Sequence, residues 1–415
     1  MPRSCVPPLV LHAPPLGALL RRYAAGTALT CEPVDEGLLN RGYRLRTTRG
    51  RYFLKHHFDP DTADPASIAR QHRATERLAD LGVPVAPPLP GHDGRTVAVV
   101  GGHAYALHPW IDGRHRHGSQ LTPGQCGRLG ALLGVVHASL EHVMRAAHGE
   151  RPLPGRGEHG PRERGENAEK AETAENAPPT RDPKRDPRRP PERRATPPER
   201  RTRAAATAPA EHTAAERPAP VESTAPAPSP DPADTFVLID DLLARVRRHR
   251  PADSFDELAR HRLLERRTLL ERHADRRPPH GGPVGWVHGD FHPFNLLYRG
   301  DAPAAIVDWD RLGVQPRAEE AVRAAAIFFV RPDGTLDLPK ARQYARAYRR
   351  AAGATPLELA AAVHRVWWER LNDFWMLRWH YERGDTRADS QFPAASALAV
   401  WWTREYDAVC GAFAD

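Results

Sequence analysis

Residues 287–297 read VHGDFHPFNLL and residues 305–310 read AIVDWD, and these two stretches decide the fold. Asp290 and Asn295 stand five positions apart between apolar residues, which predicts a loop. Asp308 follows a short apolar segment that predicts a buried strand. A loop carboxylate can accept a proton, while an amide and a second carboxylate offer the oxygen ligands that magnesium prefers. The arrangement is typical of sites that transfer a phosphoryl group from ATP.

The pattern resembles the catalytic loop of protein kinases, His-x-Asp-x-x-x-x-Asn, with Gly289 where those enzymes commonly have Arg. The His-Gly-Asp opening, and the Asp-Trp-Asp at 308–310 in place of Asp-Phe-Gly, are more similar to the aminoglycoside phosphotransferase family, kinase-like enzymes that phosphorylate small hydroxylated molecules. The resemblance implies an α+β, two-lobed protein-kinase-like fold with a small β-rich N-lobe and a mainly helical C-lobe. It also implies ATP and Mg²⁺ as cofactors, with Asp290 accepting the proton of the attacking hydroxyl and with Asn295 and Asp308 holding the metal.

Further side chains of the same stretch are candidates for supporting roles. His288 is expected to brace the loop through hydrogen bonds, as the resemblance implies, and His292 either lies near the transferred phosphate or packs. Their four-residue spacing would also suit a zinc pair on a helix, but Pro293 predicts a loop instead. Along an extended segment Asp308 and Asp310 would point to opposite faces. Asp308 is therefore the preferred metal ligand, and Asp310 either reaches a second Mg²⁺ or has a structural role in the turn.

Upstream, residues 43–47 and 51–55 alternate in the manner of two strands, which predicts a β-hairpin. Its second strand would carry Lys55, in the position where kinases present a Lys to the α and β phosphates of ATP. Residues 37–43 resemble the family's phosphate-covering turn, with Asn40 as a candidate contact. An ordinary hairpin turn explains the same residues equally well.

A helix is predicted over residues 65–81, ending before Pro84. Kinases place a Glu on this helix to pair with the strand Lys, and the family's Glu aligns with Gln71. Either Glu76 swings in to pair with Lys55, or the neutral amide of Gln71 makes the contact.

A second hairpin is predicted from residues 96–100 and 103–107. The segment that follows resembles the hinge that receives adenine. Leu107 and His108 are the candidate contacts there, and backbone groups would make them.

The 415-residue chain has a formal net charge of +8, which is compatible with holding ATP phosphates or an anionic second substrate. Prolines interrupt the apolar residues near the N-terminus, so no signal peptide is expected, and no apolar run approaches the roughly 20 residues of a membrane span. The four cysteines are isolated, which supports neither a disulfide framework nor a zinc knuckle. We therefore expect a cytoplasmic protein with no membrane contact.

Between residues 149 and 234 the apolar periodicity disappears and roughly one residue in five is proline, which predicts disorder. Acidic and basic residues are close to balanced there, which disfavours nucleic-acid binding. Helical patterns flank the stretch, so it is interpreted as an insertion in the C-lobe, and its role is left open. The predicted organisation is an N-terminal extension (1–26), a nucleotide-binding N-lobe (27–109), the start of the helical C-lobe (110–148), the insertion (149–234) and the rest of the C-lobe with the catalytic loop and acceptor site (235–415).

The C-terminal region is predicted to form helices over residues 319–330, 340–351 and 357–383. An aromatic stripe along one face of the last helix is more often core than ligand cage, yet in the family this part of the lobe commonly lines the acceptor pocket. The stripe consists of Trp368, Trp375 and Trp379. Nearby acidic residues would suit a cationic acceptor. These are Glu369, Asp373 and Glu382.

The leading prediction is an ATP- and Mg-dependent phosphotransferase, a kinase acting on a hydroxyl of a small molecule such as an aminoglycoside, an amino alcohol or an amino acid. A bacterial Ser/Thr protein kinase of the same fold is one alternative, although no activation segment ending in Ala-Pro-Glu is evident. An inactive nucleotide-binding scaffold is the other, with Gln71 as its only support. The sequence identifies neither the acceptor nor the oligomeric state.

Overall fold

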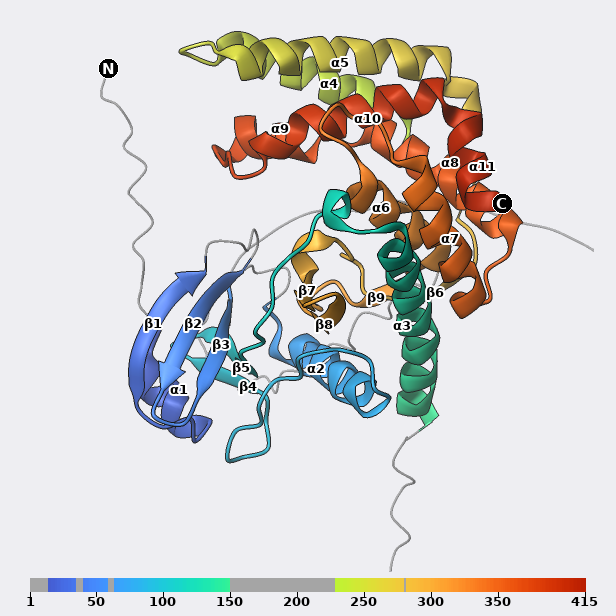
Figure 1. Cartoon of the computed structure of the whole chain (residues 1–415). Coiled ribbons are helices and arrows are strands. Elements are labelled where there is room, and N and C mark those ends of the chain that lie inside the picture. Colours follow the sequence, from blue (N-terminus) through green and yellow to red (C-terminus); the bar gives the residue numbers. More distant parts are fainter. Residues whose placement is uncertain (1–13, 35–39, 59–62, 150–227, 280) are drawn as a thin grey trace, which may run out of the picture. The chain divides into compact units, whose positions relative to one another are not determined.

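The N-terminal part of the chain is built on one antiparallel sheet. The computed structural model describes residues 14–34, 40–58, 63–149, 228–279 and 281–415. The sheet has five strands in the order β1-β2-β3-β5-β4, drawn in blue and cyan in Figure 1. The strands are β1 (Ala28–Val34), β2 (Arg41–Thr47), β3 (Arg51–His57), β4 (Val97–Val100) and β5 (His103–Pro109). Both predicted hairpins are therefore present, and β5 lies next to β3, the strand of Lys55.

A short helix, α1 (Leu16–Arg22), belongs to the core of this sheet. Leu19 and Tyr23 are buried in one apolar cluster with side chains of β2 and β3. The interpretation of residues 1–26 as an extension is thus wrong for its described part, from residue 14 onward. An extension would expose these apolar side chains, whereas the sheet buries them.

The helix α2 (Pro65–Asp80) begins and ends where the sequence predicts. The carboxylate of Asp64 accepts hydrogen bonds from the first-turn backbone N–H groups, and Pro65 fills the first position, where no N–H is needed. At the other end Gly82 adopts a φ of +80°, which stops the helix. The buried face of α2 includes Gln71.

The remainder of the chain is mainly helical. Its helices are α3 (Pro123–Gly149), α4 (Pro232–Arg248), α5 (Ser254–Arg272), α6 (Arg317–Phe329), α7 (Leu338–Ala352), α8 (Pro356–Asn372), α9 (Trp375–Arg378), α10 (Phe392–Arg404) and α11 (Tyr406–Ala414). Within the described part of the chain, no helix is long and apolar enough to cross a membrane.

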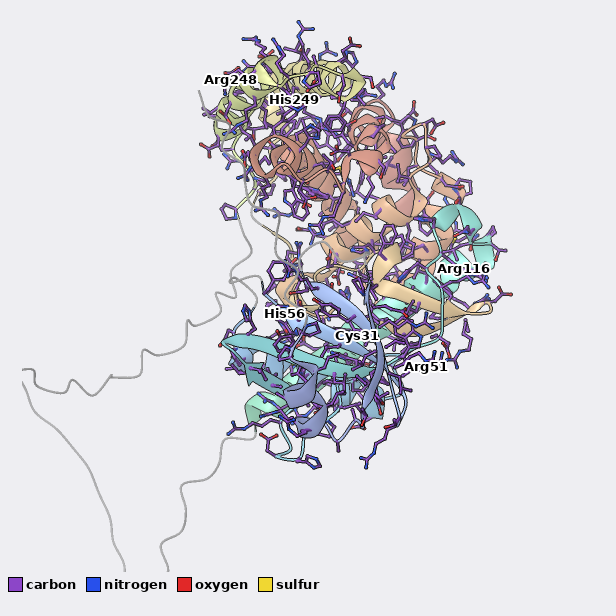
Figure 2. All side chains as sticks on the ribbon, turned by 90° about the vertical axis from the view of Figure 1, so that its left-hand side faces the viewer. Cys31, Arg51, His56, Arg116, Arg248 and His249 are labelled. Carbon is purple, nitrogen blue, oxygen red and sulfur yellow. The ribbon has the colours of Figure 1, made fainter. Side chains whose placement is uncertain are left out.

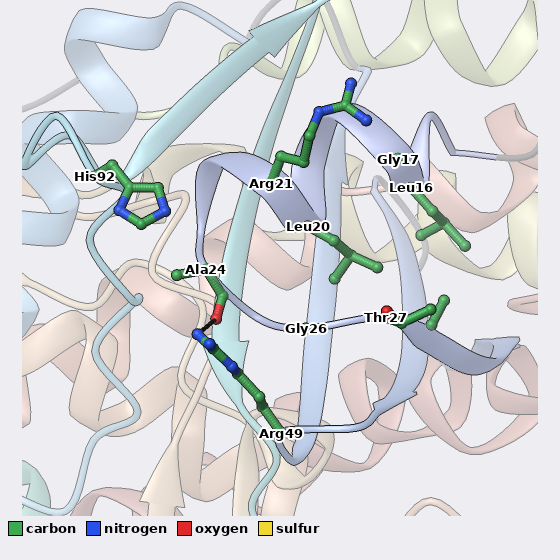
Figure 3. Close-up of a pocket in the computed structure, with 10 residues that line it drawn as sticks. Leu16, Gly17, Leu20, Arg21, Ala24, Gly26, Thr27, Arg49 and His92 are labelled. Carbon is green, nitrogen blue, oxygen red and sulfur yellow. Dashed lines mark hydrogen bonds between the residues drawn. The ribbon is translucent and has the colours of Figure 1, made fainter.

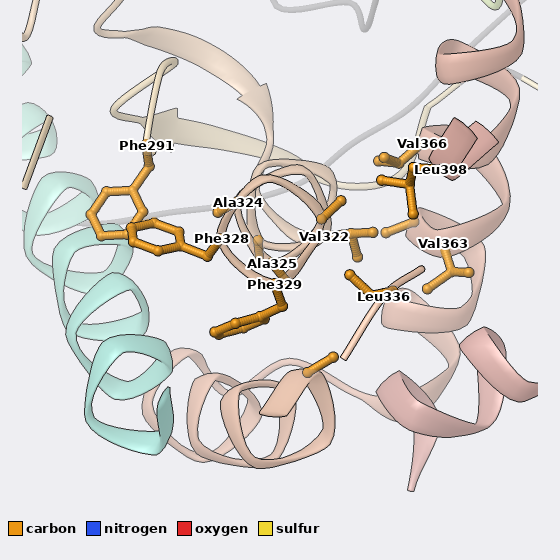
Figure 4. Packing of buried hydrophobic residues seen from close by; sticks show 14 of the residues in the cluster. Phe291, Val322, Ala324, Ala325, Phe328, Phe329, Leu336, Val363, Val366 and Leu398 are labelled. Atoms are coloured by element: carbon orange, nitrogen blue, oxygen red, sulfur yellow. The ribbon is translucent and has the colours of Figure 1, made fainter. Parts of the chain in front are cut away.

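The helix α6 lies at the centre of the helical core, between α3, α7 and α8. Figure 4 shows its Phe328 and Phe329 among the buried side chains, with Val363 and Val366 of α8 on another side. The ring of Phe328 lies 6.1 Å from that of Phe291, the residue that follows Asp290. The core thus reaches directly to the predicted catalytic loop.

The strands of two small two-stranded antiparallel sheets lie on either side of that loop in the sequence. β6 (Val284–Val287) pairs with β9 (Gly313–Pro316), and β7 (Leu296–Arg299) pairs with β8 (Ala302–Ile306). The loop residues 288–295 follow β6, and residues 307–312 connect β8 to β9. Both predicted polar segments therefore leave the ends of short strands that lie in one region of the fold.

The helix predicted over residues 357–383 is broken in the structure. α8 ends before Asp373, whose carboxylate accepts a hydrogen bond from the backbone N–H of Trp375 at 3.0 Å. The chain then forms α9 and a π-helical turn over Trp379–Arg383. The prediction of one continuous helix is wrong because Asp373 takes an extended conformation and its carboxylate bonds the backbone of Trp375.

The predicted disordered segment ends earlier than expected. α4 begins at Pro232 with the side chain of Asp231 as its cap, and the indole of Trp368 donates a hydrogen bond to the carbonyl of Pro230 at 2.9 Å. The predicted boundary at residue 234 is therefore wrong by several residues. Residues 150–227 lie outside the described residues, as do residues 35–39 of the predicted phosphate-covering turn.

Candidate active site

His288 joins the two polar segments of the site. Its Nδ1 accepts a hydrogen bond from the backbone N–H of Asp290 at 3.2 Å, and its Nε2 lies 3.0 Å from the carbonyl oxygen of Val307. A carbonyl only accepts, so Nε2 carries the proton and the ring is neutral. Burial lowers the pKa of His288, which agrees with that state. The ring therefore fixes the segment of Asp290 against the segment of Asp308.

The backbone conformation at position 289 favours glycine over any residue with a side chain. Its φ is +85°, in the region that favours glycine. A Cβ atom at this position would lie 2.1 Å from the carbonyl oxygen of Arg311. The catalytic loop and the segment of residues 307–312 thus touch at a point where no side chain fits.

A buried carboxylate of α6 also holds the backbone of the catalytic loop. It was not predicted from the sequence. Glu320 of α6 accepts hydrogen bonds from the backbone N–H groups of His288 and Gly289. It also lies 2.7 Å from Nε2 of His137, whose Nδ1 is 3.0 Å from the hydroxyl of Tyr348. The only signal in the sequence was an acidic pair at the start of an amphipathic helix, which normally indicates a solvated helix end.

Asp290 lies among groups that favour its ionised form. The side-chain amide of Asn295 donates to its backbone carbonyl at 2.9 Å, and its carboxylate is 3.6 Å from Nε2 of His292 and 4.0 Å from Nε of Arg311. Burial would raise the pKa of Asp290, but the hydrogen bond from His292 and the charge of Arg311 hold it below its usual range. Asp290 is therefore a carboxylate at neutral pH, the form that can accept a proton.

Lys55 brings β3 to the second polar segment. Its Nζ lies 2.6 Å from a carboxylate oxygen of Asp308 and 2.7 Å from one of Asp310. Asp308 has a φ of +61°, so the chain turns after β8 and both carboxylates face the same lysine. The two side chains were expected to point to opposite faces only along an extended segment, and the strand ends at Ile306, before Asp308.

The three charged groups differ in their exposure. The side chain of Asp308 is 42% exposed, whereas those of Lys55 and Asp310 are 10% and 12% exposed. Burial would lower the pKa of Lys55, but its two carboxylate neighbours raise it. Burial raises the pKa of Asp310, while contact with Lys55 outweighs burial at Asp308 and lowers the pKa there. Asp308 is thus the ionised and accessible carboxylate of the pair.

Asp310 is also the point where the other N-lobe candidates converge. The side-chain amide of Asn40 donates to its carboxylate, and the amide of Gln71 donates to its backbone carbonyl at 2.9 Å. Within the described ranges, no hydrogen bond or salt bridge joins Lys55 to Gln71 or to Glu76. Both alternatives for the partner of Lys55 are therefore wrong, because the C-lobe carboxylates take that place.

The candidate adenine contacts already make hydrogen bonds within the N-lobe. The carbonyl of Leu107 accepts from the backbone N–H of Leu89 at 2.7 Å. The ring of His108 lies 2.9 Å from the carbonyl of Ala86. An adenine contact from these residues would have to use their remaining backbone groups.

Three histidines with depressed pKa values stand close to Lys55 in the N-lobe. Burial lowers the pKa of His57 to about 2, that of His72 to about 3 and that of His108 to about 4. Among the described residues, neither ring nitrogen of His57 has a hydrogen-bond partner. These rings are therefore neutral at physiological pH and add no charge beside Lys55.

The oxygen donors for a magnesium ion would come from Asn295 and Asp308. The amide nitrogen of Asn295 donates to the carbonyl of Asp290, and its side-chain oxygen accepts no hydrogen bond from the residues that the structure describes. Asp308 offers an accessible carboxylate, whereas Asp310 is bonded to Asn40 and Lys55. A donor set made only of oxygen suits Mg²⁺.

The tryptophans of the predicted acceptor wall divide into two groups. Trp368 is fully buried and belongs to the helical core. Trp375 and Trp379 are only partly buried, and their rings meet edge to face with centroids 5.1 Å apart. The break at Asp373 separates the two groups, so the predicted stripe does not form.

Two of the three acidic candidates for a cationic acceptor are already paired. Glu369 accepts from Arg323 at 2.8 Å, and Glu382 lies 3.2 Å from Arg378. Asp373 is exposed, and no salt bridge of its carboxylate occurs among the described residues. Asp373 is therefore the better-placed of the three candidates.

A separate hollow of about 580 Å³ lies at α1, away from these groups (Figure 3). The side chain of Arg49 crosses it and donates to the carbonyl of Ala24 at 2.6 Å. None of the residues that line it belongs to the candidate active site. Its position gives no reason to assign it to catalysis.

Comparison with known protein families shows which family the chain belongs to. Residues 30–354 match the family described as the phosphotransferase enzyme family, APH. The chain belongs to this family. The resemblance inferred from the catalytic-loop motif is therefore confirmed.

Individual relatives are more distant. A homoserine kinase from Burkholderia ambifaria is 30% identical over 141 residues, which cover 34% of the chain and 40% of that kinase. The chain thus spans about 40% of the length of the curated relatives that it matches.

Two solved structures share the fold. An aminoglycoside phosphotransferase from Alicyclobacillus acidocaldarius aligns with a TM-score of 0.51 at 12% identity, covering 94% of both chains. A spectinomycin phosphotransferase in complex with ADP and spectinomycin aligns with a TM-score of 0.51 at 11% identity, covering 92% of both chains. The predicted kinase-like fold is confirmed.

Proposed function

We propose that the protein is a kinase that transfers the γ-phosphate of ATP to a hydroxyl group of a small molecule, with Mg²⁺ as the metal. The observation that carries this proposal is that Lys55, Asp308 and Asp290 are brought together by two connections. Lys55 bonds Asp308 directly, and His288 ties the segment of Asp308 to the backbone of Asp290. Membership of the phosphotransferase family supports the same reaction.

Asp290 would accept the proton of the attacking hydroxyl. Its carboxylate is ionised because His292 and Arg311 lower its pKa. Its backbone is fixed on both sides, by His288 and by Asn295. Fixed orientation matters because most catalysis of phosphoryl transfer comes from positioning and electrostatics.

The nucleotide and its metal ion would be bound by Lys55, Asn295 and Asp308. When bound, Mg²⁺ would neutralise negative charge on the phosphates. Asn295 and Asp308 offer the oxygen ligands for it, and Lys55 offers a positive charge held in place by two carboxylates. The solved structure of a family-like fold with ADP supports the choice of a nucleotide.

The acceptor would be a small hydroxylated molecule that carries a positive charge. Asp373 is exposed and has no salt bridge among the described residues, and its carboxylate accepts a hydrogen bond from the backbone N–H of Trp375, a partly buried aromatic residue. A carboxylate and an aromatic face together suit an ammonium group. The similar proteins are named as a homoserine kinase, an aminoglycoside phosphotransferase and a spectinomycin phosphotransferase, which supports amino acids and aminoglycosides as the first acceptors to try.

The test is an acceptor screen with purified protein, Mg²⁺ and ATP, read out as ADP release. We expect release that depends on one class of acceptor and stops when EDTA is added. A parallel reaction with labelled ATP and cell lysate should place the label in small molecules. Label that enters protein instead would support the protein-kinase alternative, and ATP binding without any transfer would support the scaffold.

A further inference from the structure

A second cluster of polar side chains lies in the C-lobe, on elements that carry none of the catalytic candidates. His249 follows the last turn of α4 and is labelled in Figure 2. Asp256 lies in the first turn of α5, and His380 lies in the π-helical turn after α9. One ligand atom of each of these three side chains lies within 4.8 Å of those of the other two.

His380 is oriented as a metal-binding histidine usually is. Its Nδ1 lies 2.8 Å from a carboxylate oxygen of Asp389, and its ring stacks on Phe255 with centroids 4.3 Å apart. A carboxylate on one ring nitrogen fixes the tautomer and directs the other nitrogen at the metal. Its side chain is only 8% exposed, and no hydrogen bond of Nε2 occurs within the described ranges. Nε2 is thus the ring nitrogen that remains for an ion, since Nδ1 is taken by Asp389.

Asp256 keeps acceptor capacity on the side that faces the histidines. One of its oxygens accepts from the hydroxyl of Tyr381 at 2.7 Å, and the other accepts from the backbone N–H of Asp253 at 3.0 Å. Nδ1 of His249 lies 3.1 Å and 3.0 Å from the same two oxygens. A carboxylate has about four lone-pair sites, so two remain toward His249.

We propose that His249, Asp256 and His380 form a binding site for a divalent transition-metal ion, with Zn²⁺ as the best match. Two histidines and one carboxylate, with an open fourth position, are a common ligand set for zinc. In a tetrahedral site, ligand bonds of about 2.0–2.2 Å place the ligand atoms roughly 3.5 Å apart, so ligand atoms that now lie within 4.8 Å of one another would close on the ion by a movement of roughly 1–1.5 Å. The side chain of His249 is 37% exposed, which gives the ion a path from solvent and leaves room for a water ligand.

A hydrogen-bonded pair without a metal explains only part of this arrangement. A plain pair accounts for His249 and Asp256, and it leaves Nε2 of His380 without a hydrogen bond among the described residues. The π-helical turn is a second sign, because such turns are uncommon and frequent at functional sites. A bound ion would join α4 and α5 to the segment that follows α9. The proposed site would therefore stabilise the packing of these C-lobe segments and would take no part in phosphoryl transfer.

The test measures metal binding in the full-length protein, independent of any kinase activity. Protein stripped with a chelator is titrated with Zn²⁺ and with Co²⁺, and the bound metal is counted by mass spectrometry. We expect one equivalent per chain, a visible Co²⁺ absorption typical of four-coordination, and a Tm that rises by several degrees with Zn²⁺. Because Zn²⁺ binding is read directly, a failure of the proposed kinase reaction leaves this result unaffected.

Four variants locate the site. His249→Ala and His380→Ala should each abolish stoichiometric binding, whereas His261→Ala on the exposed side of α5 should bind as the wild type does. Asp389→Asn keeps all three ligands and should weaken binding about 10- to 100-fold, since it loosens the orientation of His380. Equal Tm values of all chelated proteins show that the variants fold. Wild-type protein that retains no Zn²⁺, or Zn²⁺ retained equally by His380→Ala, would overturn the proposal.

Discussion

At the scale of single residues, two unusual backbone conformations shape the candidate site. Gly289 and Asp308 both have positive φ, at +85° and +61°. Non-glycine residues in this region are uncommon and occur where the surrounding structure enforces them, often at functional sites. Here the two conformations turn Asp308 and Asp310 toward Lys55 and let the catalytic loop touch Arg311.

The close contact at Gly289 gives the first prediction. Gly289→Ala places a Cβ at 2.1 Å from the carbonyl oxygen of Arg311, so the loop that carries Asp290 must move. Because a displacement of about 1 Å can cost about 100-fold in rate, we expect kcat to fall at least about 100-fold. Gly300→Ala is the matched control, since Gly300 also has positive φ but open space around its Cβ. Similar kcat values for the two variants would contradict the account.

The partner of Lys55 gives the second prediction. Asp310 occupies the place that a glutamate of α2 was expected to take, and Gln71 contacts Asp310 instead. Asp310→Asn should lower kcat/KM for ATP about 10- to 100-fold, because Lys55 loses a buried charge partner. Lys55→Ala should remove the same interaction, so the double variant Lys55→Ala/Asp310→Asn should be little worse than Lys55→Ala alone. Losses of the two single variants that simply add in the double variant would show that Asp310 does not act through Lys55.

At the scale of elements, β3, α2 and β5 contribute three histidines whose pKa values are lowered by burial. In the unfolded chain these rings take up protons below about pH 6.5, whereas the folded N-lobe holds them neutral to about pH 4 or lower. The unfolded state therefore binds more protons, and stability is complete above about pH 6.5 and falls as pH decreases toward the folded pKa values. Each histidine contributes up to about 1.4 kcal/mol per pH unit in that window.

The third prediction follows from this linkage. His57→Leu removes a buried ring that has no hydrogen-bond partner in the described part of the chain. We expect the drop in Tm between pH 7 and pH 5.5 to be smaller in this variant than in the wild type. His261→Gln, which changes an exposed histidine, should keep the wild-type drop. A His57→Leu protein with the full wild-type drop would rule out this cause.

The elements that could be predicted from sequence are those with local signals. The β2–β3 hairpin follows from alternation, and α2 follows from Asp64, Pro65 and Gly82 at its ends. The helix break at Asp373 contains no proline or glycine, so the helical pattern of the sequence does not mark it. α1 was missed because its short apolar pattern stands directly after several prolines.

In the site, too, only the residues with a local sequence signal could be predicted. The loop motif identifies Asp290, Asn295 and Asp308 as candidates because their spacing is local. The contact of Asp310 with Lys55 depends on the left-handed turn at Asp308, which the sequence pattern does not signal. Glu320 was missed because its partners lie far from it along the chain.

At the scale of the whole molecule, the catalytic loop is attached to both the sheet and the helical core. Phe291 packs against Phe328 of α6, and Glu320 of the same helix holds the loop backbone. Lys55 connects the sheet to the far end of β8. The loop backbone is therefore held from two sides, and the proton transfer proposed for the loop depends on the carboxylate of Asp290.

The most direct measurement is turnover and ATP binding of the Asp290→Ala variant, compared with the wild type. General-base effects are typically about 100- to 10,000-fold, so acceptor-dependent ADP release should fall by at least about 100-fold. The thermal shift caused by Mg-ATP should remain, because Lys55, Asn295 and Asp308 are unchanged. Normal turnover of Asp290→Ala would contradict the assignment of Asp290 as the base.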